Sequence, residues 1–139
     1  MSQYDAILFA NAAFYAAFTA RDTSAMEQAW AHDKPVSCVH PGRVAITGRD
    51  AVLRSWQAIM RNPESPGISS HMEKVQLHGD LAVVTCVEQL TLPSGRQFLA
   101  ATNVFVRAGA LWFLVHHHAG PFQGDPGISD EKEPKPALN

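Results

Sequence analysis

Side chains alternate with a period of two along LAVVTCVEQLTL (residues 81–92) and FLAATNVFVR (residues 98–107). This period is typical of β-strands, whose successive side chains point to opposite faces of a sheet. The same pattern occurs at residues 70–77 and 111–119. Glycine supplies the positive φ that tight hairpin turns need, so we predict a meander of four antiparallel strands. The turns between them are Gly79-Asp80, Ser94-Gly95 and Ala108-Gly109.

Helical spacing replaces this alternation in the N-terminal part of the chain. A second, short helix is predicted after Ser24, which forms a capping-box pattern with Glu27. Residues 36–40 predict a strand, and a third helix is predicted to start at a Thr47 cap and to end at Asn62. Helices followed by a strand meander are typical of the α+β class. The first helix is predicted from one apolar face, made of Ile7, Ala10, Phe14, Ala17 and Phe18.

Length and composition limit the kinds of partner. The chain has 139 residues, of which 46% are hydrophobic and 17% charged, and its net charge is −2. These values predict one compact domain, residues 1–122, with a sizeable core. The low charge provides no footprint for nucleic acid or anionic lipid. No apolar run reaches the ~20 residues that a membrane-spanning helix needs, so no membrane partner is expected.

The remaining features bear on location and on the C-terminus. The N-terminus has no basic segment followed by an apolar stretch, so we expect a cytoplasmic protein. Cys38 and Cys86 lie on different predicted strands, and we expect two buried free thiols, which fits a reducing compartment. Residues 123–139 are poor in apolar side chains and predict a flexible tail.

Several separate motifs occur in the order found in one superfamily. They are Arg21-Asp22, Trp30-Ala31-His32-Asp33, Val39-His40-Pro41-Gly42, Gly48-Arg49-Asp50-Ala51-Val52, Ala101-Thr102-Asn103-Val104-Phe105, and Trp112 through Gly120. Together with the order of elements, they resemble the nuclear transport factor 2-like superfamily, especially its SnoaL-like and ketosteroid-isomerase-like branch. The resemblance implies a cone-shaped, cystatin-like roll, in which a curved antiparallel sheet wraps around the N-terminal helices and encloses a pocket.

The resemblance also implies a homodimer that forms through the outer face of the sheet. In the last predicted strand, Val115 and His117 share one side, which the resemblance places inside the cone. Trp112 and Leu114 lie on the other side. Because a sheet face wetted by water does not carry such bulky apolar residues, we expect the dimer partner to cover Trp112 and Leu114.

Three candidate catalytic residues follow from the resemblance. His40 resembles the position of the catalytic base, Asn103 resembles a hydrogen-bond donor on a strand, and His117 is expected to act as a second acid–base or binding group. Phe14 occupies or neighbours the position of a tyrosine donor, a role that Tyr15 could take if the helix were rotated. A histidine can abstract a proton near neutral pH, and an amide can stabilise an enolate oxygen. Because Phe14 cannot donate, efficient ketosteroid isomerisation is not expected.

The other pocket candidates form a mostly apolar wall for a small apolar or carbonyl-containing molecule. Glu88 is the carboxylate among them and could orient or pair with a histidine, although either side of its strand could face inward. No organic cofactor is expected, because proton abstraction next to a carbonyl needs only a base and a donor. These substrate-binding candidates are Phe14, Trp30, Val52, Trp56, Cys86, Glu88 and Val115.

A structural interpretation stands beside each of these roles. His40 could cap the turn that follows it, and Asn103 and His117 could be core side chains with satisfied hydrogen bonds. The tryptophans could serve packing alone. His116 and His118 share a strand face, a spacing used by some metal centres, but no third ligand is apparent, so we expect no metal and instead hydrogen bonding at the dimer interface.

Two functions remain open from the sequence. The first is a small-molecule-binding protein that catalyses cofactor-independent proton transfer, such as isomerisation, cyclisation or dehydration. The second is a noncatalytic ligand-binding or dimeric association module, because the last strand also looks like the association domain of a calmodulin-dependent kinase. A cavity on which His40 and Asn103 converge would favour the first function, and a cone plugged by side chains would favour the second.

Overall fold

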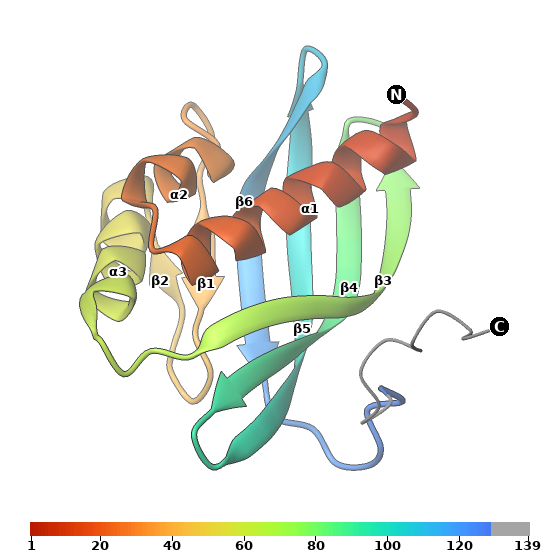
Figure 1. Ribbon diagram of the computed structural model, residues 1–139. Coiled ribbons are helices and arrows are strands. Elements are labelled where there is room, and N and C mark those ends of the chain that lie inside the picture. Colours follow the sequence, from red (N-terminus) through yellow and green to blue (C-terminus); the bar gives the residue numbers. More distant parts are fainter. Residues whose placement is uncertain (129–139) are drawn as a thin grey trace, which may run out of the picture.

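A computed structural model describes residues 1–128 of the chain, and it contains three helices and one curved sheet in that part (Figure 1). The strand order is β2-β1-β6-β5-β4-β3, and all pairs are antiparallel except β1 with β6. The α+β roll predicted from the sequence is confirmed. The elements are α1 (Gln3–Ala20), α2 (Thr23–Ala29), β1 (Ser37–Val39), β2 (Ile46–Thr47), α3 (Arg49–Arg61), β3 (Gly67–His78), β4 (Leu81–Leu92), β5 (Gly95–Ala108) and β6 (Leu111–Gly120).

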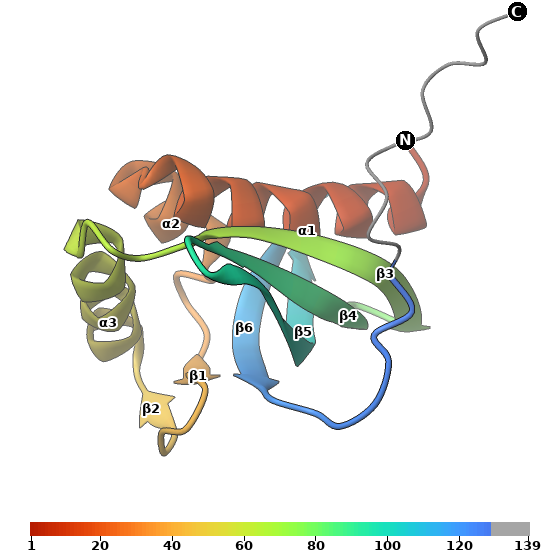
Figure 2. The same cartoon turned by 60° about the horizontal axis from the view of Figure 1, so that its bottom comes forward.

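Helix α1 lies across the inner face of the sheet, and α3 stands beside β1 and β2 at one side (Figure 2). The N-cap of α1 is Ser2, whose hydroxyl accepts a hydrogen bond from the N–H of Asp5 at 3.0 Å. The helix ends at Arg21, which adopts a left-handed conformation with φ of 55°. The Arg21 guanidinium donates to the carbonyls of Asn62 at 2.7 Å and Ser65 at 2.9 Å. The end of α1 therefore holds the loop that follows α3.

Two helix starts differ from the prediction. Asp22, rather than Ser24, is the N-cap of α2, and its carboxylate accepts the N–H of Ala25 at 3.0 Å. Thr47 belongs to β2, so Gly48, with φ of 92°, is the N-cap of α3. Strand β2 has only two residues, which is too short to produce a periodic signal in the sequence.

Strands β3 and β5 begin earlier than predicted, at Gly67 and Gly95 instead of residues 70 and 98. Pairing with β4 includes the first residue of each strand, since Gly67 of β3 pairs with Thr91 and Gly95 of β5 pairs with Leu92. Backbone hydrogen bonds to β4 therefore extend these strands beyond the residues whose side chains alternate.

A β-bulge in β6 reverses the expected faces of its first half. Pairing with β5 slips at Val115, which is the extra residue between two regular segments. Trp112 and Leu114 consequently point inward, with 5% and 0% of their surface exposed, and His117 points inward beyond the bulge. The expectation that a dimer partner covers Trp112 and Leu114 is wrong, because both side chains belong to the core of the single chain.

Other expectations can be compared with residues 1–128. Cys38 and Cys86 are buried free thiols, as predicted. Among the helices of this part of the chain, none combines the length and apolar character required to cross a membrane. Most of the predicted tail, residues 129–139, lies outside the described residues.

Candidate functional site

A cavity of about 220 Å³ lies between α3, the turn after β1 and the inner face of the sheet. Its walls are mostly apolar, and its ionisable side chains are concentrated at the sheet and at the turn. Four residues predicted for the site line this cavity: His40, Trp56, Glu88 and His117.

Glu88 on β4 and His117 on β6 form a buried pair at the cavity wall. Each is 2% exposed, and Nε2 of His117 lies 3.7 Å from Oε2 of Glu88. Burial raises the pKa of Glu88 to about 7, although a hydrogen bond from Tyr15 opposes the rise. Burial, reinforced by the other histidines, lowers the pKa of His117 to about 3. At neutral pH, Glu88 therefore exchanges a proton easily while His117 stays uncharged.

Asn103 lies behind His117, inside a hydrogen-bonded partition between the sheet and α1. Its amide oxygen is 2.5 Å from Nδ1 of His117. Its amide nitrogen donates to Oδ1 of Asn11 at 2.9 Å and to the hydroxyl of Tyr15 at 3.0 Å. Tyr15 in turn donates to Glu88 at 2.7 Å. All the polar atoms of the Asn103 side chain therefore have partners within the protein.

The hydrogen bonds of this partition have one consistent direction. Tyr15 stays protonated, because burial and the nearby Glu88 raise its pKa, and it gives its single proton to Glu88. It must then accept from the nitrogen of Asn103, which turns the amide oxygen toward His117. His117 therefore carries its hydrogen on Nδ1, and the lone pair of Nε2 is on the side of Glu88.

His40 occupies the other end of the cavity, in the turn after β1. The hydroxyl of Ser55 donates to the carbonyl of Val52 at 2.6 Å, so it accepts from Nε2 of His40 at 2.9 Å. Burial and the charge of Arg43 lower the pKa of His40 to about 4. The ring of Trp56 lies between the two ends, 4.7 Å from the ring of His40 and 5.5 Å from the ring of His117.

The remaining predicted residues lie around the cavity rather than in its lining. Phe14 packs against the rings of His117 and Trp56, at 5.1 Å and 5.3 Å. Cys86 contacts the Tyr15 hydroxyl at 3.3 Å, within the partition. The others are Trp30 and Val52, which are fully buried in the core, and Val115, which is the bulge residue of β6.

Sequence reasoning missed three polar residues at or near this site, and it considered a fourth, Tyr15, only for a rotated helix. Asn11 and the inward position of Tyr15 were detectable, because both interrupt the apolar face of α1 at a spacing of four residues. Arg43, which lines the cavity, and Ser55, which binds His40, gave no such signal, because Arg43 lies in a turn and Ser55 is one of several polar residues of the amphipathic helix α3. Tertiary packing alone brings them to the site.

The structure bears on metal binding only through geometry. Within residues 1–128, no three His, Cys, Asp or Glu side chains converge so that they could hold a metal ion. Nδ1 of His116 instead lies 2.7 Å from the hydroxyl of Ser37, on the neighbouring strand β1.

Comparison with known proteins adds to this geometry. Residues 7–122 match the SnoaL-like domain family, a match that covers most of the chain. The chain belongs to the SnoaL-like family. This SnoaL-like domain has the fold of the nuclear transport factor 2-like (NTF2-like) superfamily, so the resemblance seen in the sequence is confirmed.

Two solved structures are similar to this SnoaL-like domain. One is a proposed dehydratase of the NTF2-like family from Streptomyces avermitilis, with 36% identity, coverage of 86% of this chain and 96% of that chain, and a TM-score of 0.78. The other is a proposed calcium/calmodulin-dependent protein kinase type II association domain from Thiobacillus denitrificans. It has 32% identity, coverage of 82% and 93%, and a TM-score of 0.76.

A curated relative is similar over much of the domain. The F-box protein SKIP8 of Arabidopsis thaliana is 30% identical over 114 residues, which cover 82% of this chain and 48% of the relative. The chain therefore spans about half the length of that protein.

Proposed function

We propose that this SnoaL-like domain binds a small carbonyl compound in its cavity and moves a proton on it, with Glu88 as the group that takes and returns the proton. The observation that carries this proposal is the buried carboxyl–imidazole pair of Glu88 and His117 at the cavity wall. A general acid–base group works best when its pKa lies near the working pH, and the pKa of Glu88, about 7, meets this condition.

This proposal changes three roles expected from the sequence. His40 is a weaker base than Glu88, since burial and Arg43 lower its pKa to about 4. Asn103 uses both amide hydrogens inside the partition, so it has none to offer a substrate oxygen. We assign Asn103 and His117 to positioning, because they hold the hydrogen bonds around Glu88.

Dehydration of a β-hydroxy carbonyl compound fits these groups. The carboxylate of Glu88 takes the proton from the carbon next to the carbonyl, and the electron pair of that C–H bond moves toward the carbonyl oxygen. The guanidinium of Arg43, which lines the cavity and has no hydrogen-bond or ion-pair partner in residues 1–128, stabilises this charge. The carbon–carbon double bond then forms, and the hydroxyl leaves with the proton from Glu88 as water. The similarity to a proposed dehydratase supports this reaction.

The size of the cavity limits the substrate. Ligand pockets commonly measure about 300–1,000 Å³, and this one, at about 220 Å³, is smaller. We therefore expect a substrate much smaller than a four-ring steroid, with its carbonyl oxygen at Arg43 and its apolar part against Trp56.

Incubation with small β-hydroxy ketones in D₂O tests the proposal, with NMR following deuterium uptake next to the carbonyl and loss of water. We expect Glu88→Gln to lower both rates by at least about 100-fold, the usual contribution of a general acid–base group. Glu64→Gln makes the same charge change in the exposed loop after α3 and serves as the matched control. Activity retained by Glu88→Gln, or no exchange with any compound by the native protein, would contradict the proposal.

A second candidate function, assembly into a homodimer, is favoured by the outer face of the sheet. Apolar residues pair across this face, with Val83 opposite Val104 and Val106 opposite Phe113, and all four are only partly buried in the single chain. The similarity to a proposed association domain supports the same function.

Sedimentation at micromolar concentration tests this assembly. We expect a dimer for the native chain and a monomer for Val106→Glu, because the new carboxylate would be buried without a partner. Val44→Glu, at an 86% exposed residue in the β1–β2 loop, is the matched control and should remain a dimer. A native monomer would exclude this assembly.

A further inference from the structure

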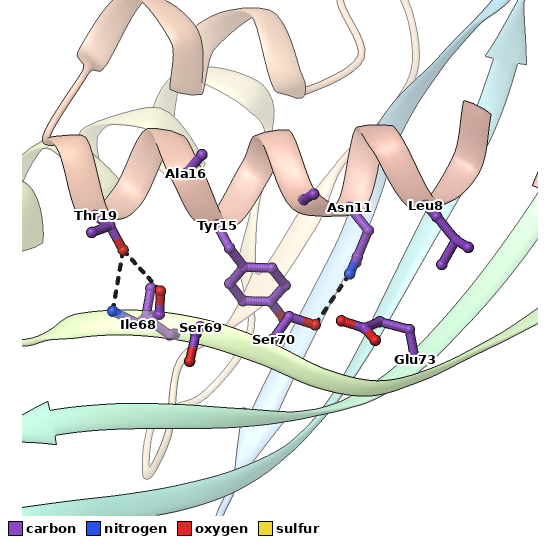
Figure 3. Close-up of a pocket in the computed structure, with 10 residues that line it drawn as sticks. Leu8, Asn11, Tyr15, Ala16, Thr19, Ile68, Ser69, Ser70 and Glu73 are labelled. Carbon is purple, nitrogen blue, oxygen red and sulfur yellow. Dashed lines mark hydrogen bonds between the residues drawn. The ribbon is translucent and has the colours of Figure 1, made fainter. Parts of the chain in front are cut away.

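A second hollow, of about 510 Å³, lies between α1 and β3 (Figure 3). Tyr15 lines this groove and also donates to Glu88, so the partition separates the groove from the cavity described above. Ile68 lines both hollows, but no ionisable residue lines both of them. The groove can therefore be considered as a site of its own.

Glu73 is the only charged residue among those that line the groove. Its carboxylate has no ion-pair or hydrogen-bond partner within residues 1–128, and it points toward the Asn11–Ser70 pair (Figure 3). No Lys, Arg or His residue lines the groove. Electrostatic attraction therefore favours a cation there and disfavours an anion.

A β-bulge in β3 places Glu73 at the groove. Regular pairing with β4 is interrupted between His71 and Lys74, and Met72 adopts a left-handed conformation with φ of 57°. With strict alternation, Met72 rather than Glu73 would follow Ser70 on the same face of the strand. The bulge turns the carboxylate toward α1 instead, which is a common effect of bulges next to binding sites.

The opposite wall of the groove is apolar and made of small side chains. Leu8, Ala12 and Ala16 lie at a spacing of four residues along the exposed side of α1. Two alanines leave room for an alkyl chain beside the helix, and the ring of Tyr15 closes the bottom of the groove (Figure 3). The groove thus combines one anionic group with a narrow apolar wall.

We propose that the groove between α1 and β3 binds primary ammonium ligands with a short alkyl chain. The carboxylate of Glu73 and the hydroxyl of Ser70 accept hydrogen bonds from the ammonium group, and the chain lies along Leu8, Ala12 and Ala16. This site does not depend on the proton-transfer function, because neither Glu88 nor His117 lines the groove.

NMR titration of the ¹⁵N-labelled protein with n-butylammonium, 1-butanol and butanoate tests the proposal at fixed pH and ionic strength. These probes have similar size and differ in charge. We expect saturable shifts of backbone signals from α1 and β3 with n-butylammonium, weaker binding of 1-butanol and no binding of butanoate. Equal binding of n-butylammonium and 1-butanol would overturn the proposal.

Two variants separate the groove from general attraction of cations to an acidic surface. Glu73→Gln should weaken n-butylammonium binding about fivefold, as expected for an ion pair near a protein surface, whereas Glu64→Gln should leave it unchanged. Ala16→Phe fills the groove from the exposed side of α1 and should abolish binding while the charge of Glu73 is kept. Circular dichroism checks that each variant is folded. Equal effects of Glu73→Gln and Glu64→Gln, or undiminished binding by Ala16→Phe, would contradict the proposal.

Discussion

The two ends of the cavity contain one histidine each, but their surroundings differ. His117 lies on a central strand, and its ring is held by Asn103, which also binds two residues of α1. His40 lies in a turn and has one side-chain oxygen partner, Ser55, on α3. The first end is a closed network that gives Glu88 a defined environment, whereas the second consists of the bond to Ser55 and a longer contact with the Cys38 thiol at 3.7 Å. Both amide hydrogens and the amide oxygen of Asn103 have partners within the protein, so the side chain offers no free donor to a substrate.

Removing Asn103, which is the centre of the hydrogen-bonded partition, should have the largest effect on the free energy of unfolding. Asn103→Leu removes one hydrogen bond each from His117, Asn11 and Tyr15, and a buried polar atom left unsatisfied costs about 1–3 kcal/mol. We expect the free energy of unfolding to fall by about 3–5 kcal/mol in urea denaturation followed by circular dichroism. A loss below about 1 kcal/mol would show that the network does not form as described.

Acid should destabilise the protein through both histidines. Their folded-state pKa values lie below the usual 6.5, so the unfolded chain binds more protons as the pH falls from 6.5 to 4. The stability that they contribute is therefore fully present above pH 6.5, and it is lost as the pH falls toward 4 for His40 and toward 3 for His117. The share of His40 corresponds to about 3 kcal/mol, which His40→Gln should remove from the pH dependence of unfolding. An unchanged pH profile of this variant would contradict the account of His40.

The stability that Glu88 contributes should change with pH in the opposite direction to that of the histidines. Its pKa rises from 4.5 to about 7 on folding, so the folded chain holds a proton that the unfolded chain has lost. Its contribution to stability is fully present below pH 4.5 and is lost as the pH rises through 7. Glu88→Gln should therefore make stability increase more steeply between pH 4.5 and 6.5 than in the native protein. An unchanged slope would indicate a carboxyl whose pKa does not shift on folding, and a shallower increase would indicate a lowered pKa; either result would contradict this account of Glu88.

The smallest effect is expected at the His40 end. Ser55→Ala removes one hydrogen bond to a side chain at the cavity edge, which typically costs about 1 kcal/mol. The same variant frees His40 to exchange tautomers, and ¹⁵N NMR of the imidazole should show a mixture where the native protein shows hydrogen on Nε2 alone. If Ser55→Ala is as destabilising as Asn103→Leu, the contrast between the two ends fails.

The fold was accessible from the sequence because its signals are local. Alternation in residues 81–92 and 98–107 and the apolar face of the first helix each depend on neighbouring residues. The bulge at Val115 was not accessible, because an extra residue changes the facing side without interrupting the alternation of residue types. Trp112 and Leu114 were for that reason assigned to the wrong face.

The site was predicted only in part, for a different reason. His40, Trp56, Glu88 and His117 were recognised as pocket residues and line one cavity. The role of Asn103 depends on contacts with Asn11 and Tyr15 that are distant in the sequence, and nothing in a single strand reports such contacts. Hydrogen-bond saturation is a tertiary property, so residue type alone could not distinguish a donor for substrate from a donor for the core.

The protonation of Glu88 and His117 is the central claim, and NMR measures it directly. Titration of a protein labelled with ¹³C at the carboxyl of Glu88 and ¹⁵N in histidine should show Glu88 changing state near pH 7. Over pH 5–8.5, His117 should remain neutral with its hydrogen on Nδ1. An ionised Glu88 with a normal carboxyl pKa, beside a doubly protonated His117 at neutral pH, would contradict the account.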